Sequence, residues 1–128
     1  MKILHTSDWH LGQRFLSNDR REEHQLALDW LRKTIEKEAI DLLIVAGDIF
    51  DISNPPSSAR TMYYRFLADL RATNCRHIII VGGNHDSPSM LNAPKEILEM
   101  LNVHVVGAAT EKMEDTIIEL RGANGQLE

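Results

Sequence analysis

Side chains that commonly bind metal ions follow three short apolar segments of this chain. They lie in residues 7–10, 47–51 and 83–86, each cluster directly after a run of mainly apolar residues. The clusters offer carboxylate and amide oxygens and imidazole nitrogens but no thiolate, a mixture that suits Mn²⁺ and related divalent ions better than a structural zinc. A single Asp or Asn after a strand is more often a turn former or a helix cap. The three clusters together predict a metal site.

The spacing of these residues suggests a role for each. Asp8 and His10 are two residues apart, so in an extended segment their side chains project to the same side and could hold one ion. Asp48 is the candidate bridge, because one carboxylate can bind two ions about 3.5–4 Å apart, the spacing of two-metal phosphoryl-transfer sites. Asn84 offers a carbonyl oxygen to the second ion. His85, its neighbour in sequence, is better placed to donate to the scissile phosphate or to the leaving oxygen.

Other residues of the clusters have supporting roles in this interpretation. Asp51 and Asp86 are expected to fix the orientation of a ligand or a histidine without binding an ion themselves. Trp9 lies between two proposed ligands and is either a pocket wall, a stacking platform for a base, or a packed side chain. Arg14 could contact phosphates of DNA, although arginines in this region are usually only solvated.

The elements that must position these clusters alternate between strands and helices. Strands are expected at residues 2–6, 41–46 and 77–82, and helices at residues 19–38 and 57–73. Parallel strands joined by right-handed crossovers place all three strand ends at one edge of the sheet, where ligands of open α/β sheets bind. The sequence therefore predicts an α/β fold built from successive βαβ units, with the metal site at the carboxyl ends of the strands.

The first helix has a recognisable apolar face. Ser17 or Asn18 is expected to cap it, and His24 is expected on its solvated side. The positions at helical spacing that predict its buried face are Ala27, Leu28, Trp30, Leu31 and Ile35.

The end of the chain has weaker signals. Pro94 suits the first turn of a short helix over residues 94–101. Strands are expected at residues 103–106 and 115–120, separated by a turn that begins with a glycine.

Composition limits the classes of protein to which this chain can belong. Its 128 residues are enough for about one domain, and Cys75, the only cysteine, excludes an internal disulfide. No apolar run approaches the roughly 20 residues that span a bilayer, and the N-terminus lacks a signal peptide, so a cytoplasmic protein with no membrane contact is expected. The net charge of −5 argues against a broad basic face for nucleic acid, unless bound cations cancel several acidic groups.

The three clusters resemble the first signatures of the calcineurin-like metallophosphoesterase superfamily. The signatures are Asp-Trp-His at residues 8–10, Gly-Asp-Ile-Phe-Asp at 47–51 and Gly-Asn-His-Asp at 83–86. Within the superfamily, residues 3–12 and 55–66 resemble the SbcD family of bacterial nuclease subunits. The resemblance extends over about residues 1–107.

This resemblance implies a fold and an activity. The fold is an αββα sandwich, of which residues 1–128 would form the N-terminal βαβαβ portion. The activity is a DNA exonuclease and endonuclease that depends on two divalent ions, Mn²⁺ or alternatively Mg²⁺, and acts on duplex ends and hairpins in DNA repair, recombination and replication with an SbcC-type SMC-like ATPase. By the same resemblance two nuclease subunits pair as a homodimer, through helices at about 57–73 and 94–101.

The family pattern also assigns the site residues. By resemblance, Asp8 and His10 hold one metal, Asp48 bridges, Asn84 holds the other, and His85 assists the leaving group. The family completes its site with a further histidine and a Gly-His-x-His segment downstream, whereas only His104 follows Asp86 here. We therefore expect this chain to be the N-terminal part of a longer nuclease domain.

Two other functions remain open from the sequence. One is a phosphodiesterase that acts on a cyclic nucleotide or another small diester, because fold alone does not select a substrate. The other is a module without activity that dimerises or binds DNA ends, suggested by the absent histidines and the two amphipathic helices.

Overall fold

The computed structural model describes residues 1–109, 117–122 and 124–127. Four parallel strands form one sheet in the order β1-β4-β5-β6. Their bounds are Ile3–Thr6 for β1, Leu42–Ala46 for β4, His77–Val81 for β5 and Val103–Val106 for β6. Each strand is a short run of mainly apolar, β-branched or leucine residues without a breaker. The predicted strands and their parallel arrangement are confirmed.

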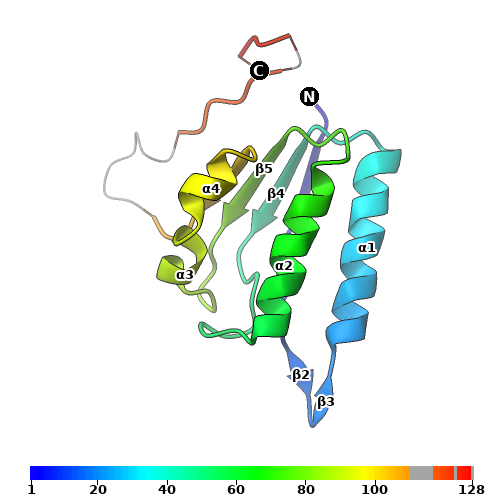
Figure 1. Ribbon diagram of the computed structural model, residues 1–128, viewed down its shortest axis with the longest axis vertical. Coiled ribbons are helices and arrows are strands. Elements are labelled where there is room, and N and C mark those ends of the chain that lie inside the picture. Colours follow the sequence, from blue (N-terminus) through cyan, green and yellow to red (C-terminus); the bar gives the residue numbers. More distant parts are fainter. Residues whose placement is uncertain (110–116, 123, 128) are drawn as a thin grey trace.

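Two long helices lie side by side over one face of the sheet (Figure 1). They are α1 (Arg21–Lys37) and α2 (Ser57–Leu70). Two short helices, α3 (Pro88–Asn92) and α4 (Lys95–Glu99), follow β5 and pack against β6. Because both long helices connect parallel strands, they begin at the edge where β1 and β4 end. That edge is the one at which the sequence placed its metal ligands.

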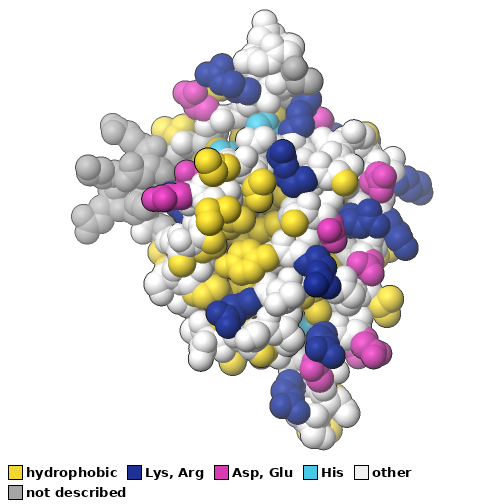
Figure 2. Space-filling model, viewed as in Figure 1, with side chains coloured by type: hydrophobic (Ala, Val, Ile, Leu, Met, Phe, Trp, Pro, Cys, Tyr) yellow, Lys and Arg dark blue, Asp and Glu magenta, His cyan; other side chains and the backbone are white. Residues whose placement is uncertain are grey.

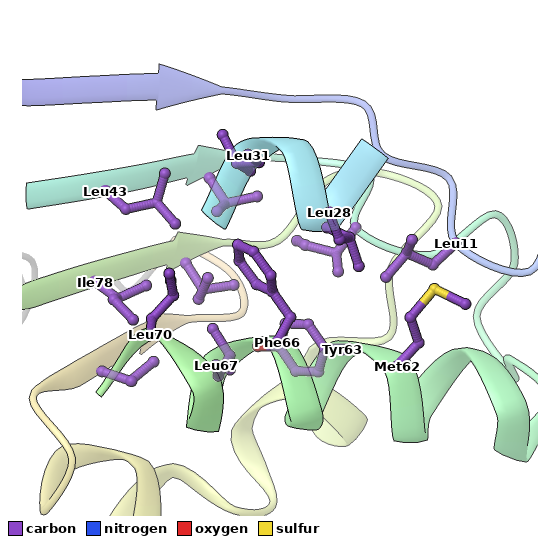
Figure 3. Close-up of a cluster of buried hydrophobic side chains, with 14 of the residues drawn as sticks. Leu11, Leu28, Leu31, Leu43, Met62, Tyr63, Phe66, Leu67, Leu70 and Ile78 are labelled. Atoms are coloured by element: carbon purple, nitrogen blue, oxygen red, sulfur yellow. The ribbon is translucent and has the colours of Figure 1, made fainter. Parts of the chain in front are cut away.

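The hydrophobic core lies between this helical layer and the sheet (Figure 3). Its members alternate along the strands, with Leu43 and Val45 fully buried on β4 and Ile80 on β5. The helices contribute residues at helical spacing: Leu28, Leu31, Ile35, Met62, Tyr63, Phe66, Leu67 and Leu70. Burial of each side chain of this size stabilises the folded protein by about 1.5–3 kcal/mol. The core therefore holds in place the sheet whose strand ends carry the predicted metal ligands.

The opposite face of the sheet is only partly covered by the described residues: Leu42 and His77 are buried there, and the His77 ring contacts the Arg121 carbonyl (2.8 Å). Neighbouring strands place Ile3, Ile44, Ile79 and Val81 on this face, and Ile3 and Val81 have 54% and 36% of their surface exposed. The described residues thus form one helical layer and one sheet. This α/β arrangement is consistent with the expected fold class. Among the described residues, no helix is long and apolar enough to cross a membrane.

The segment before α1 differs from the prediction. Residues Arg14–Phe15 and Asn18–Asp19 form a small antiparallel hairpin, β2 and β3, which projects beyond the start of α1 (Figure 1). Neither Ser17 nor Asn18 caps the helix. The helix begins at Arg21 instead, whose amide donates to the Asp19 carboxylate (2.9 Å). A tight turn at Leu16 and Ser17 competes here with helix capping for the same small polar residues.

The two faces of α1 were also partly misassigned. Trp30 is 66% exposed although its position matched the apolar spacing, and His24 is buried rather than solvated. His24 lies four residues before Leu28 and seven before Leu31, so it shares their face and was excluded by its polarity rather than by its spacing. Ala27 is exposed as well as Trp30, because a helix advances by about 100° per residue and both lie outside the stripe formed by residues 24, 28, 31 and 35.

The helix predicted at residues 94–101 is present as the shorter α4, and α3 precedes it where no helix was predicted. Ser87 accepts a hydrogen bond from the Met90 amide and starts α3 at Pro88, and Pro94 then begins α4. Of the strand predicted at residues 115–120, positions 115 and 116 lie outside the described residues, and 117–120 form no strand. The predicted strand at 103–106 is confirmed as β6.

Candidate metal centre

Asp8, His10 and Asp48 gather their donor atoms at the carboxyl ends of β1 and β4. One ligand atom from each lies within 4.8 Å of the others. The His10 Nε2 atom is 3.9 Å from a carboxylate oxygen of Asp8 and 3.9 Å from one of Asp48. Two carboxylates and an imidazole nitrogen are separated here by distances that an ion of about 2.0–2.3 Å bond length can span with small movements. This geometry fits a divalent cation held by all three side chains.

Asp51 lies beside the ring of His10. Its Oδ1 atom lies 3.3 Å from the His10 Nδ1 atom, on the side of the ring opposite the ligand group. The contact is close without being well aligned, since Nδ1 has no hydrogen-bond partner among the described residues. A carboxylate behind a histidine favours a proton on Nδ1 and leaves Nε2 free to bind an ion. The structure thus places Asp51 where the predicted supporting role requires it.

His85 lies beside this group without joining it. Its ring packs edge-to-face against the ring of His10, with centroids 5.3 Å apart, and is open to solvent. Its Nδ1 atom is 2.8 Å from the carbonyl oxygen of Asp51. A carbonyl only accepts, so Nδ1 carries a proton and Nε2 faces outward. This hydrogen bond, with the nearby carboxylates of Asp48, Asp51 and Asp86, raises the pKa of His85 above its usual value.

Asp86 has a different role from the one its cluster suggested. It is buried, and its two oxygens accept from three backbone amides: Ile49 (3.1 Å), Phe50 (2.9 Å) and Gly83 (2.8 Å). The carboxylate therefore ties the loop after β5 to the loop after β4. It holds the backbone that directly follows Asp48, and not the side chain of a ligand. The spacing of residues in the sequence could not indicate this role.

The loop after β1 follows the loop after β4 beyond the end of the sheet. The Asp8, His10 and Leu11 amides donate to the carbonyls of Gly47, Asp48 and Ile49 at 2.9–3.1 Å. This pairing brings residues 8–10 against residues 47–49. Three ligands along it, Asp8, His10 and Asp48, have positive φ angles of 54°, 46° and 47°. Left-handed backbone is uncommon outside glycine and gathers at functional sites, so these angles are independent support for a site here.

Asn84 lies on the same edge, exposed, in the loop after β5. Its side chain makes no hydrogen bond to the described residues, so its amide oxygen is available to a ligand. The neighbouring Gly83 sits so close to Asp48 that a Cβ atom at this position would overlap its carboxylate and its amide nitrogen. The loop after β5 can approach Asp48 only because residue 83 has no side chain.

Comparisons with known proteins agree with this site. A sequence model described as calcineurin-like phosphoesterase matches residues 1–121. The chain belongs to the calcineurin-like phosphoesterase family. The predicted family resemblance is therefore confirmed.

Several curated relatives share one name, the D subunit of the nuclease SbcCD. The chain is 52% identical over 109 residues to the protein of that name from Escherichia coli (strain K12), which covers 85% of this chain and 27% of the relative. It is 38% identical over 110 residues to the one from Bacillus subtilis (strain 168), covering 86% and 28%. With the Rhodobacter capsulatus protein it shares 38% over 133 residues, covering 99% and 33%. The chain spans about a third or less of the length of these relatives.

Two residues predicted to contact DNA, Trp9 and Arg14, lie close in sequence to the ligand group. Trp9 packs edge-to-face on Phe66 of α2, with ring centroids 5.3 Å apart, and its indole nitrogen donates to the Thr6 hydroxyl (3.1 Å). The ring is only partly buried, so packing and contact with a ligand are compatible. Arg14 is exposed on β2 and donates to the Ser17 carbonyl (3.0 Å).

Proposed function

We propose that this chain is part of a Mn²⁺-dependent DNA nuclease subunit that hydrolyses phosphodiester bonds with two divalent ions. The observation that carries the proposal is the group of Asp8, His10 and Asp48 at the carboxyl ends of two parallel strands. Its support comes from the family match over residues 1–121 and from relatives named as nuclease subunits. Carboxylate and imidazole ligands without thiolate suit Mn²⁺ or Mg²⁺ rather than a structural zinc.

Four residues of the site would bind the two ions, and two others would position them. Asp8 and His10 would hold one ion, Asp48 would bridge, and Asn84 would hold the second. Bound divalent ions would neutralise phosphate charge and lower the pKa of an attacking water. Asp51 keeps the His10 Nε2 atom directed at the ligand group. Asp86 keeps the Asp48 backbone in place.

His85 would complete hydrolysis as a proton donor. Attack of water on the phosphorus breaks the bond to the leaving oxygen, which must gain a proton as it departs. The raised pKa of His85 increases the protonated fraction of its ring relative to a free histidine, and the hydrogen bond from Nδ1 to the Asp51 carbonyl leaves the Nε2–H of that form for the leaving oxygen.

The open sheet face and the coverage of the relatives support a longer domain. We propose that residues 1–128 form the N-terminal part of an αββα sandwich, whose second sheet packs on the face that carries Ile3, Ile44 and Ile79. An apolar face exposed over several strands is costly in water. The remaining metal-binding histidines expected for this family would come from that part.

The same proposal includes two partners. Relatives are named as subunits of SbcCD, and an SMC-like ATPase is the expected partner of the nuclease. For a homodimer, Figure 2 shows hydrophobic side chains gathered between α2 and α4. Ile97 and Met100 are 66% and 83% exposed near the end of this region, which suits pairing with a second copy.

The proposal is tested by nucleotide release from duplex DNA ends by the full-length protein in Mn²⁺. His85→Ala should lower the rate about 100-fold or more, because a general acid contributes about 10²–10⁴-fold. An unchanged rate would show that the role of His85 is wrong. Efficient hydrolysis of a small diester without cleavage of DNA would instead favour the small-molecule phosphodiesterase, and failure to bind Mn²⁺ would favour a non-catalytic module.

A further inference from the structure

A second polar pocket lies next to the metal centre, between the starts of α1 and α2 and the β2–β3 hairpin. Its volume is about 240 Å³, large enough for a phosphate group. Gly12, two residues after His10, forms part of its wall and packs against Pro56 and Ala59 of the second loop and α2. The pocket therefore shares a loop with the ligand group. We propose that it binds a phosphate of the DNA backbone, an inference that rests on the proposed nuclease function.

The beginning of α2 supplies part of the electrostatic attraction. This 14-residue helix starts at Ser57 after Pro56, and its first amides meet no side-chain cap. Uncapped amides and the helix dipole favour an anion at this end. Ser58, in the first turn, lines the pocket and adds a hydroxyl.

His24 is an independent indication of a ligand in this pocket. The side chain is 8% exposed and lines the pocket from α1. Its Nδ1 atom is shielded and has no hydrogen-bond partner among the described residues, which is unusual for a buried polar group. Burial, aided by the charge of Arg20, lowers the pKa of His24, so the ring is neutral at pH 7. The shielded Nδ1 cannot itself meet a ligand, but in the neutral tautomer with its proton on Nε2 the ring would offer that N–H to a phosphate oxygen; His24 also borders an apolar pocket formed with Trp9 and Leu28.

Two arginines add positive charge at the pocket. Arg14 and Arg21 both line it, and neither forms an ion pair within the part of the chain that the structure describes. Arg20, by contrast, pairs with Glu23 at 2.7 Å and is not part of the wall. The one carboxylate in the wall is Asp19, which accepts from the Arg21 amide. Two guanidinium groups and a helix start outweigh this single acid, although the whole chain carries a charge of −5.

A neighbouring groove extends the basic surface along the helices. It shares Arg21, Ser58 and Met62 with the pocket and adds Arg65 of α2 and one acid, Glu22 of α1. Figure 2 shows several Lys and Arg side chains from α2 towards the hairpin, with Asp and Glu side chains among them. A chain of phosphates could follow this surface, whereas a free phosphate needs only the pocket. The continuity favours DNA as the source of the phosphate.

Binding of a fluorescent duplex by the full-length protein in EDTA tests the proposal without requiring cleavage. Arg21→Gln should weaken binding about 5-fold at moderate salt and reduce the slope of log K against log salt by about 1, because one phosphate contact is lost. Arg32→Gln is the matched control: it makes the same charge change on α1, lies outside the pocket wall, and should leave both values unchanged. Equal effects of the two substitutions would overturn the proposal.

Inorganic phosphate identifies the source of the anion. We expect phosphate to shift the NMR signals of the His24 ring in the wild-type protein but not in Arg21→Gln, and duplex DNA to compete for the same site. Phosphate binding that DNA does not displace would assign the pocket to free phosphate or a mononucleotide and overturn its role in DNA binding. A protein that binds DNA through Arg21 but never cleaves it would disprove the nuclease function while leaving this pocket in place.

Discussion

The loops after β4 and β5 each carry an aspartate close to the metal centre, and the two carboxylates face opposite ways. Asp48 turns towards His10, with one oxygen 3.9 Å from the His10 Nε2 atom, and its other oxygen accepts from the His85 amide (3.1 Å). Asp86 turns inward and accepts from three amides in both loops. Asp48 keeps one oxygen free for an ion beside its single link to the loop after β5, whereas both oxygens of Asp86 bind backbone amides of the two loops. Residues of the same type, at corresponding strand ends, thus differ in function because one is desolvated and saturated with donors.

The largest difference between the two loops should appear in activity. Asp48→Asn keeps the size of the side chain and removes the charge and one ligand oxygen. We expect at least about a 100-fold loss of Mn²⁺-dependent cleavage with little loss of stability, because even residues behind the ligands cost about 10–100-fold when changed. The measurement is the single-turnover rate beside a thermal unfolding curve. Loss of stability without loss of activity would reverse the roles that we assign to Asp48 and Asp86.

Asp86→Ala should act mainly on stability. Removing the carboxylate leaves three buried amides without acceptors, and we expect a loss of about 3–5 kcal/mol in the free energy of unfolding. Denaturant titration measures it. Asp86→Asn is the matched control, because it retains one acceptor oxygen and should lose less. If Asp86→Ala unfolds at the wild-type denaturant concentration, the carboxylate does not hold the loops.

Gly83→Ala should have an intermediate effect on both properties. The added methyl group would overlap Asp48, so the two loops must separate. Overpacking of this kind costs about 1–3 kcal/mol. We also expect weaker Mn²⁺ binding, measured by calorimetry, because Asp48 is displaced. Wild-type affinity for Mn²⁺ in this variant would show that the ligand group tolerates movement of the loop after β5.

The smallest effect should come from an exposed link between the same loops. Ser53 donates to the His85 carbonyl at 3.1 Å, and both residues are open to solvent. Ser53→Ala should cost about 0.5–1 kcal/mol or less, because water can replace the lost donor. Comparing the loss in free energy of unfolding for Ser53→Ala with the loss for Asp86→Ala shows whether an exposed hydrogen bond between the loops stabilises the protein less than buried ones do.

The fold could be predicted from the sequence because its strands are short apolar runs between turn residues, and their pairing follows from right-handed crossovers. Asp8, His10 and Asp48 were brought together on the same basis, since each follows a strand. Their left-handed backbone could not be predicted, because it depends on the pairing of two loops distant in sequence. The inward rotation of Asp86 depends on a second tertiary contact, between the loops after β4 and β5.

Helix α1 shows how accurately burial can be predicted from apolar spacing. Its apolar spacing located the core through Leu28, Leu31 and Ile35, yet it assigned Trp30 to the wrong face and left His24 outside. A hydrophobic pattern averages over several turns and cannot resolve one position. His24 became informative only when its burial and its unpartnered nitrogen were known, and no residue type or spacing marks such a nitrogen.

The open face of the sheet has a consequence for how this stretch of chain behaves by itself. Twisted sheets stack through apolar faces at about 10 Å, and β1 and β6 are edge strands that offer unpaired backbone groups. Expressed as 128 residues alone, the chain should therefore self-associate as its concentration rises. Replacing Ile79 with Lys in the middle of that face should keep such a fragment monomeric while leaving the helical side of the sheet intact.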